Sequence, residues 1–171
     1  MRLEGEAWSR YFRDFTRSAF RLELLPVYTM PGEADELRRF EAGEKPPPDY
    51  HYGWLDTVPA ARRAGKTISR VRVVRRPLTT YIRYEFEWGF VYNVKAGEDI
   101  RVLDLTDQSG PDLPDHDFWL FDETIVVKLL YRPDGTQIGR ELVQTPDLDA
   151  YRGWRDATWQ AAVPFRDYWH G

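Results

Sequence analysis

The sequence contains no cysteine, which excludes disulfide bonds and thiolate metal sites. A small secreted domain held together by disulfides is therefore excluded, and we expect a cytoplasmic protein. Residues 1–15 carry a charge every two or three positions and lack the apolar run of a signal peptide or membrane span. We expect no association with a membrane.

Lysine is also scarce, because 20 of the 24 basic residues are arginine. Arginine suits bidentate contacts with phosphate or carboxylate, but GC-rich genomes favour arginine codons as well, and we attribute the bias mainly to such a bacterial genome. The net charge of -4 and the lack of a basic stripe or recognition helix argue against direct nucleic-acid binding.

The composition suits one folded domain over residues 1–171. The chain is 42% hydrophobic and 15% aromatic, enough apolar surface for a core. Residue periodicity predicts strands at 20–24, 68–74, 99–105, 118–121 and 124–131, and helices at 6–19, 33–42, 57–64, 77–87 and after Thr145-Pro146. A Pro-rich loop over 44–54 separates two of these helices.

The order of these elements predicts the fold class. Two strands separated by a helix, 68–74 and 99–105, are expected to pair in parallel, whereas the turns at 122–123 and 132–135 favour antiparallel neighbours. The fold class is therefore α/β, a mixed sheet flanked by helices.

Familiar catalytic and cofactor motifs fail in this sequence. Gly65-Lys66-Thr67 matches the end of a phosphate-binding loop, but Ala60 occupies the position of an essential glycine and the strand and helix come in the wrong order. The three histidines lack the spacing of zinc ligands, and the acidic stretch 112–123 lacks a calcium-loop pattern. We predict no metal and no cofactor.

Charged residues near the predicted strand ends are the candidates for a ligand site. They are Arg70, Arg72, Arg101, Glu98, Asp99, Asp117 and Asp122. Ligands of open α/β sheets bind beyond the carboxyl ends of the strands, so a small-anion site or an unusual acid–base site is reasonable there. The alternative, which we favour, is structural ion pairing with residues such as Arg21 and Glu23.

The first predicted helix carries four aromatic residues, Trp8, Tyr11, Phe12 and Phe15, at helical spacing. This face is either a core element or an exposed surface for a partner, and periodicity alone does not separate the two.

Four segments resemble an actinobacterial family of unknown function whose members are commonly encoded beside helix-turn-helix regulators. They are SAFRLELLPVY, GKTISRVRVVRRPLTTYIRYEFE, AGEDIRVLDL and DFWLFDETIVVKLLY. The resemblance implies a small cytoplasmic protein with a helix-turn-helix regulator as its partner.

The element order over residues 57–171 also resembles one half of a phospholipase D-like domain, with residues 1–56 as an N-terminal helical and strand extension. Active members carry a histidine, a lysine two residues later and an aspartate five residues after that. With Asp122 aligned to the aspartate, the lysine position holds Asp117 and the histidine position Asp115. The resemblance implies an inactive copy, in which a homodimer restores the two-half symmetry but not the chemistry.

The sequence thus predicts a non-catalytic regulatory or protein-interaction module. The alternative is an enzyme or small-anion-binding protein with an atypical Arg/carboxylate site.

Overall fold

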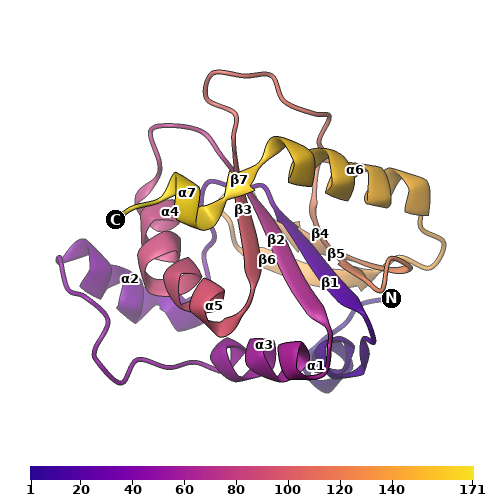
Figure 1. Cartoon of the computed structure of the whole chain (residues 1–171), viewed down its shortest axis with the longest axis horizontal. Coiled ribbons are helices and arrows are strands. Elements are labelled where there is room, and N and C mark those ends of the chain that lie inside the picture. Colours follow the sequence, from indigo (N-terminus) through magenta and orange to yellow (C-terminus); the bar gives the residue numbers. More distant parts are fainter.

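The computed structural model describes residues 1–171 and contains one seven-stranded sheet with helices on both faces (Figure 1). The strands are β1 (Ser18–Glu23), β2 (Thr67–Val74), β3 (Asp99–Asp104), β4 (Asp117–Phe121), β5 (Ile125–Tyr131), β6 (Gln137–Leu142) and β7 (Val163–Pro164). The helices are α1 (Gly5–Asp14), α2 (Ala34–Glu41), α3 (Trp54–Arg63), α4 (Thr80–Glu85), α5 (Val91–Ala96), α6 (Leu148–Ala161) and α7 (Phe165–Tyr168). A 3-10 turn, η1 (Pro31–Glu33), precedes α2, and a π-helical turn, η2 (Phe86–Phe90), joins α4 to α5.

The strand order is β6-β5-β4-β1-β2-β3-β7. The β1–β2 and β2–β3 pairs are parallel, and the β4, β5, β6 and β7 pairs are antiparallel. The predicted α/β class with a mixed sheet is confirmed. Residues 1–56, expected as an extension of a core over 57–171, supply the central strand β1 and are therefore built into the same sheet.

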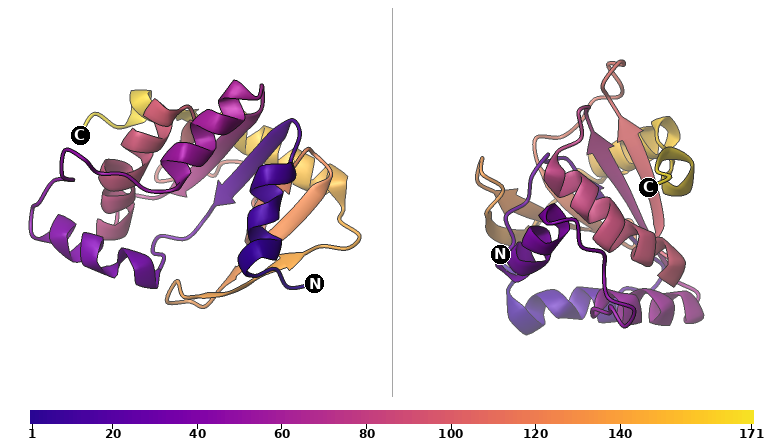
Figure 2. Two further views of the ribbon diagram at one scale, coloured as in Figure 1. Left: turned by 90° about the horizontal axis from the view of Figure 1, so that it is seen from below. Right: turned by 90° about the vertical axis from the view of Figure 1, so that its left-hand side faces the viewer.

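The two faces of the sheet bury different sets of side chains, because successive residues of a strand point in opposite directions. On one face, Leu22, Val71 and Phe118 pack against Tyr151 of α6. On the other, α1 and α3 cover Ile68 and its neighbours, and α4, η2 and α5 cover the β3 side. The two views in Figure 2 show α6 apart from the group formed by α1 to α5.

The first predicted helix is too long. It ends at Asp14, Phe15 is extended, and Ala19 belongs to β1. Aromatic residues at helical spacing continue up to Phe15, but the backbone N–H groups of residues 16–18 bond to the side chain of Asp122 instead of to a preceding helical turn.

The predicted start of the last helix is also wrong. Asp147, not Thr145, is the N-cap, since its Oδ1 accepts from the N–H of Ala150 at 3.1 Å.

The helix predicted over 77–87 begins later and ends later than expected. It begins at Thr80 and continues through η2 and α5 to Ala96. Glycine at position 89 does not stop it, because the π-helical turn carries the backbone through.

None of the helices combines the length and the apolar composition required to span a membrane.

Candidate ligand-binding cleft

A cleft of about 710 Å³ opens on the sheet face that carries α1 to α5. Strands β1, β2, β4 and β5 contribute to its floor, and α1 and the α4–η2 segment contribute walls. Of the 27 residues that line it, twelve are aromatic. They are Trp8, Phe12, Tyr28, Tyr50, Tyr52, Trp54, Tyr81, Tyr84, Trp88, Phe90, Trp119 and Tyr131.

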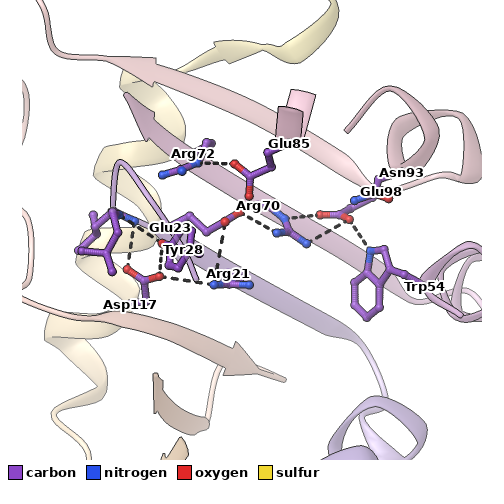
Figure 3. Close-up of polar contacts among 12 residues, drawn as sticks. Arg21, Glu23, Tyr28, Trp54, Arg70, Arg72, Glu85, Asn93, Glu98 and Asp117 are labelled. Atoms are coloured by element: carbon purple, nitrogen blue, oxygen red, sulfur yellow. Dashed lines mark hydrogen bonds and ion pairs between the residues drawn. The ribbon is translucent and has the colours of Figure 1, made fainter. Parts of the chain in front are cut away.

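The floor carries a network of buried ion pairs, which we call the floor network (Figure 3). Its members are Arg21, Glu23, Arg70, Arg72, Glu85, Glu98 and Asp117. Strand register explains it: Arg21 lies beside Arg70 and Glu23 beside Arg72 on parallel neighbours. Two like charges side by side under a layer of helices require carboxylates within reach.

Arg70 is held by two carboxylates. Its Nη1 donates to Oε1 of Glu23 at 2.6 Å and its Nε to Oε2 of Glu98 at 2.7 Å. Glu98 also accepts from the indole Nε1 of Trp54 at 2.6 Å. Two residues further along β2, Nε of Arg72 donates to Oε1 of Glu85 at 2.7 Å. Both guanidiniums are therefore held by partners within the fold.

Arg21 is bonded more loosely. Its Nη2 lies 3.4 Å from Oδ2 of Asp117 and 3.2 Å from the hydroxyl oxygen of Tyr131, and its buried Nε has no hydrogen-bond partner. Asp117 is better satisfied, because it also accepts from the hydroxyl of Tyr28 and from the backbone N–H of Leu24.

Two carboxyl groups of the floor network have pKa values shifted in opposite directions. Burial would raise the pKa of Glu23, but the charges of Arg21, Arg70 and Arg72 outweigh it and lower that pKa below its usual range. Burial raises the pKa of Glu85 well above its usual value, and the negative charge of Glu23 adds to the effect against the attraction of Arg72. Glu85 therefore holds its proton more strongly than Glu23.

The α4–η2 wall presents its side chains at helical spacing. Tyr81, Tyr84, Glu85 and Trp88 lie at positions i, i+3, i+4 and i+7 and all line the cleft. Ring centroids are 5.7 Å apart for Tyr81–Tyr84 and 6.2 Å for Tyr84–Trp88. We call Tyr28, Tyr50, Tyr81, Tyr84 and Trp88 the tyrosine wall.

Two glutamates border the tyrosine wall. Oε1 of Glu33 accepts from the hydroxyl of Tyr81 at 3.0 Å, and Oε1 of Glu36 accepts from the hydroxyl of Tyr84 at 3.0 Å. Burial raises the pKa of Glu33, although the tyrosine hydroxyls oppose the shift. This end of the cleft is therefore acidic and aromatic.

The opposite wall comes from α1 and β6. Trp8 and Phe12 line it with their ring centroids 4.9 Å apart in a T-shaped contact. The guanidinium of Arg140 lies over the Trp8 ring, 5.2 Å from its centroid, and Arg13 pairs with Glu6. This end is aromatic and basic.

Comparison with known proteins places this arrangement in a family. The domain of unknown function DUF6879 matches residues 6–170. The chain belongs to the DUF6879 family. Among curated proteins, none matches it.

The chain is also similar to a solved structure. It is a phospholipase D family member, Nuc from Salmonella typhimurium, with 14% sequence identity and a TM-score of 0.46 over 94% of this chain and 91% of that chain.

In this DUF6879 chain, four of the seven predicted ligand residues meet in the floor network: Arg70, Arg72, Glu98 and Asp117. Of these four, Arg70 lines the cleft directly, and Asp117 lies just beyond the carboxyl end of β1, where it accepts from the N–H of Leu24. The structural ion pairing with Arg21 and Glu23 that we favoured is present. Because Arg70 also lines the cleft, a role for it in ligand binding can still be tested.

The other three predicted residues lie elsewhere. Arg101 points to the opposite sheet face, because its neighbour Ile100 is the residue paired with Arg70. Its Nη1 donates to the carbonyl of Trp159, and its guanidinium lies 4.2 Å from that ring centroid. Asp99 is exposed. The expected convergence of Arg101 with the β2 arginines is therefore wrong.

Asp122 has a structural role in the DUF6879 chain. Its carboxylate accepts from the backbone N–H groups of Thr16, Arg17 and Ser18 at 2.8, 2.6 and 3.0 Å. Partial burial would raise the pKa of Asp122, but these three donors outweigh it and lower the pKa. The aspartate thus fixes the connection between α1 and β1.

His116 also lies away from the cleft. Its ring nitrogens contact Oδ1 of Asp115 at 2.7 Å and the hydroxyl of Tyr151 on α6 at 2.9 Å. His116 therefore packs on the α6 side of the sheet, whereas Asp117 belongs to the floor network.

The aromatic residues of α1 face the sheet. Phe15 is buried, and Trp8, Tyr11 and Phe12 are partly buried against Phe121. Of the two roles that the sequence leaves open for this face, the structure shows the core one, and Trp8 and Phe12 also line the cleft.

Sequence reasoning missed the tyrosine wall and its glutamates. The spacing of residues 81–88 was a usable signal, but it predicted only a helix over 77–87 and no lining of a cleft. Tyr50 comes from the Pro-rich loop, where no periodicity marks a lining residue.

Proposed function

We propose that this chain is a non-catalytic ligand-binding module that holds a small organic molecule in the cleft. The observation that carries the proposal is the cleft itself, about 710 Å³ in volume with twelve aromatic lining residues over a charged floor. Sites for small molecules are typically concave, about 300–1,000 Å³ in volume and rich in aromatic side chains, with a few polar groups that fix orientation.

The state of the polar groups supports binding rather than covalent catalysis. The hydroxyls of Ser9 and Thr57, which line the cleft, donate to backbone carbonyls of their own helical turns. The carboxylates of Glu23 and Glu98 are engaged by arginine. A nucleophile needs a base within hydrogen-bond reach, and these groups are already committed to structural partners.

The cleft can be tested by filling it. Gly89 lines the cleft, and a Cβ built there meets no atom within 4 Å. Gly153 on α6 is equally open but lies on the other face of the sheet. We expect Gly89→Leu to fold and to lose binding of any cleft ligand, while Gly153→Leu binds as the unmodified protein does.

The measurement is a fragment screen by thermal shift, followed by tryptophan fluorescence titration, since Trp8, Trp54, Trp88 and Trp119 line the cleft. Fragments that bind the unmodified protein and Gly153→Leu but not Gly89→Leu support the proposal. A library without a binder, or binders indifferent to Gly89→Leu, would overturn it.

Association with a helix-turn-helix regulator stays a prediction drawn from the family resemblance. The aromatic face of α1, expected as one partner surface, packs on the sheet, so a regulator would have to contact other surfaces. Affinity capture from the native host, washed at physiological salt, tests it: recovery of a regulator supports the association, and recovery of the chain alone contradicts it.

A further inference from the structure

Resting on the proposed ligand-binding function, we infer that the cleft takes an organic cation, an amine with an aromatic or aliphatic tail. The inference starts from the distribution of charge inside the cleft. Glu33, Glu36 and Glu85 line one end, and only Arg72, beneath the floor, pairs with one of them. Glu33 and Glu36 accept hydrogen bonds from tyrosine hydroxyls and form no ion pair with lysine or arginine.

These carboxylates are not isolated acidic residues on an open surface. Glu33 is part of the cleft lining, no lysine or arginine pairs with it, and burial raises its pKa. A ligand cation beside it would supply the missing charge. Glu36 also lines the cleft, and its carboxylate accepts from the hydroxyl of Tyr84 at the border of the tyrosine wall.

Aromatic rings surround the same end. The tyrosine wall forms a chain of neighbouring rings, with Tyr28–Tyr81, Tyr81–Tyr84 and Tyr50–Trp88 centroids 5.9, 5.7 and 5.5 Å apart. Ring faces attract ammonium groups, and an enclosure of several rings is how proteins recognise alkylated ammonium ligands. The protein's own Arg39 already lies over the ring of Trp88, 5.6 Å from its centroid.

An anionic ligand fits the floor less well. The guanidinium of Arg70 is neutralised by Glu23 and Glu98, and that of Arg72 is hydrogen-bonded to Glu85. At the acidic end, an anion would lie beside Glu33 and Glu36, where neither carboxylate has an arginine or lysine partner to offset the repulsion. The tail of a cationic ligand, in contrast, can extend over Trp54, Trp119 and Phe12, which line the cleft farther along.

The test compares four probes of similar size: phenethylamine, benzyltrimethylammonium, neutral phenethyl alcohol and anionic hydrocinnamate. We expect both cations to bind about tenfold more tightly than the alcohol, because each gains one partly buried ion pair with a cleft carboxylate. Hydrocinnamate should bind most weakly. Affinities are measured by tryptophan fluorescence and by calorimetry.

The variants Glu33→Gln and Glu36→Gln should each weaken cation binding by several-fold to about tenfold and leave phenethyl alcohol unchanged. Glu41→Gln is the matched control, because it removes the same charge from an exposed position of α2, the helix that carries Glu36, and it should change the binding of neither probe. Thermal unfolding of each variant verifies the fold.

If hydrocinnamate or phenethyl alcohol bound more tightly than the two cations, at a site that Gly89→Leu blocks, the cation inference would be overturned. The proposed ligand-binding function would remain intact. Binding of none of the four probes would also overturn the inference, and the fragment screen then decides the broader function separately. Cation binding that is equally weakened by Glu41→Gln would show general surface attraction instead of the cleft site.

Discussion

The guanidinium of Arg70 on β2 reaches across to the carboxylate of Glu23 on β1, with Nη1 2.6 Å from Oε1. Both side chains are almost entirely buried, 9% and 2% exposed. Removal of one partner from a buried ion pair leaves an uncompensated charge, which is far more costly than the loss of the attraction alone. The stability of the floor network therefore depends on the ion pair between Arg70 and Glu23.

Glu23→Gln should lower the free energy of unfolding by about 3–5 kcal/mol, because it leaves Arg70 and Arg21 without their shared carboxylate. Urea denaturation at neutral pH measures the change. Glu6→Gln, which breaks only the exposed pair with Arg13, serves as control and should leave the midpoint unchanged. If Glu23→Gln lowered the free energy of unfolding no more than Glu6→Gln does, the floor network would have no structural role.

Glu85→Gln should behave differently although Glu85 belongs to the same network. Because the pKa of Glu85 is raised, the native state holds a proton there that the unfolded chain releases, so the stability of the unmodified protein declines as pH rises from the usual glutamate pKa towards the raised one. Glutamine imitates the protonated carboxyl, so at mildly acidic pH the substitution should cost less than about 1 kcal/mol.

The stability difference between Glu85→Gln and the unmodified protein should then move in favour of the variant as pH rises. Chemical denaturation across a pH series measures it. If Glu85→Gln proved as damaging as Glu23→Gln at every pH, the two carboxyl groups would carry equal charge and the assigned proton would be wrong.

Asp122→Ala should destabilise the protein by about 2–3 kcal/mol, since three backbone N–H groups lose a charged acceptor. The backbone at position 122 has φ 51°, which asparagine tolerates better than alanine, so Asp122→Asn should cost less. The pKa of Asp122 is lowered, so its contribution is present above the unfolded value and disappears below about pH 4. The unmodified protein should therefore lose stability in acid more steeply than Asp122→Ala; parallel acid-unfolding curves would refute the assignment.

Gly135→Ala should cost more than about 2 kcal/mol, through backbone strain and a clash. Gly135 has φ +86°, and an added Cβ would lie 2.4 Å from the carbonyl oxygen of Val27. Gly43 has φ +83° with open space around it, so Gly43→Ala isolates the strain, about 1 kcal/mol. Thermal unfolding of the two variants compares them, and equal losses would mean that the hairpin tip does not pack closely on the segment after β1.

Binding of phenethylamine should weaken as pH falls, because Glu33 takes up a proton while the amine stays charged. The pKa of Glu33 is raised above 4.5, so the loss should begin at a higher pH than for an exposed glutamate. Glu33→Gln should flatten this profile, and calorimetric titrations of both proteins across mildly acidic pH test it. An unchanged profile in the variant would assign the titration to another group.

The sequence was sufficient for strands β1 to β5 because their signals are local, but the strands predicted from periodicity do not include β6 or the two-residue β7. Alternation in ISRVRVV and the turn at Asp122-Glu123 are properties of a few adjacent residues, and both are found in the structure. Helix boundaries were less predictable. The N–H groups that would continue α1 bond to Asp122, and a contact between residues 16–18 and 122 leaves no trace in a local pattern.

The cleft was only half predictable for the same reason. Arg70 and Arg72 stand out as charges in a β-branched strand, but periodicity does not reveal which carboxylates meet them. Glu85 comes from the following helix, and Glu98 from the start of β3. Glu33 reaches the lining from the 3-10 turn η1 and Tyr50 from the Pro-rich loop, and only the folded chain brings them to Tyr81 and Trp88.

The central place of β1 has a consequence for how the chain acquires its structure during synthesis. Ala19 of β1 pairs with Ile68 of β2 on one side and with Phe121 of β4 on the other. β1 is synthesised first, and its partner β4 follows about one hundred residues later. Such a long sequence separation between paired strands slows folding. The part of the sheet that forms the floor of the cleft is complete only after β4 has left the ribosome. A nascent chain halted before β4 would expose Phe20 and Leu22 along an open strand edge, the kind of edge on which unfinished chains associate with one another.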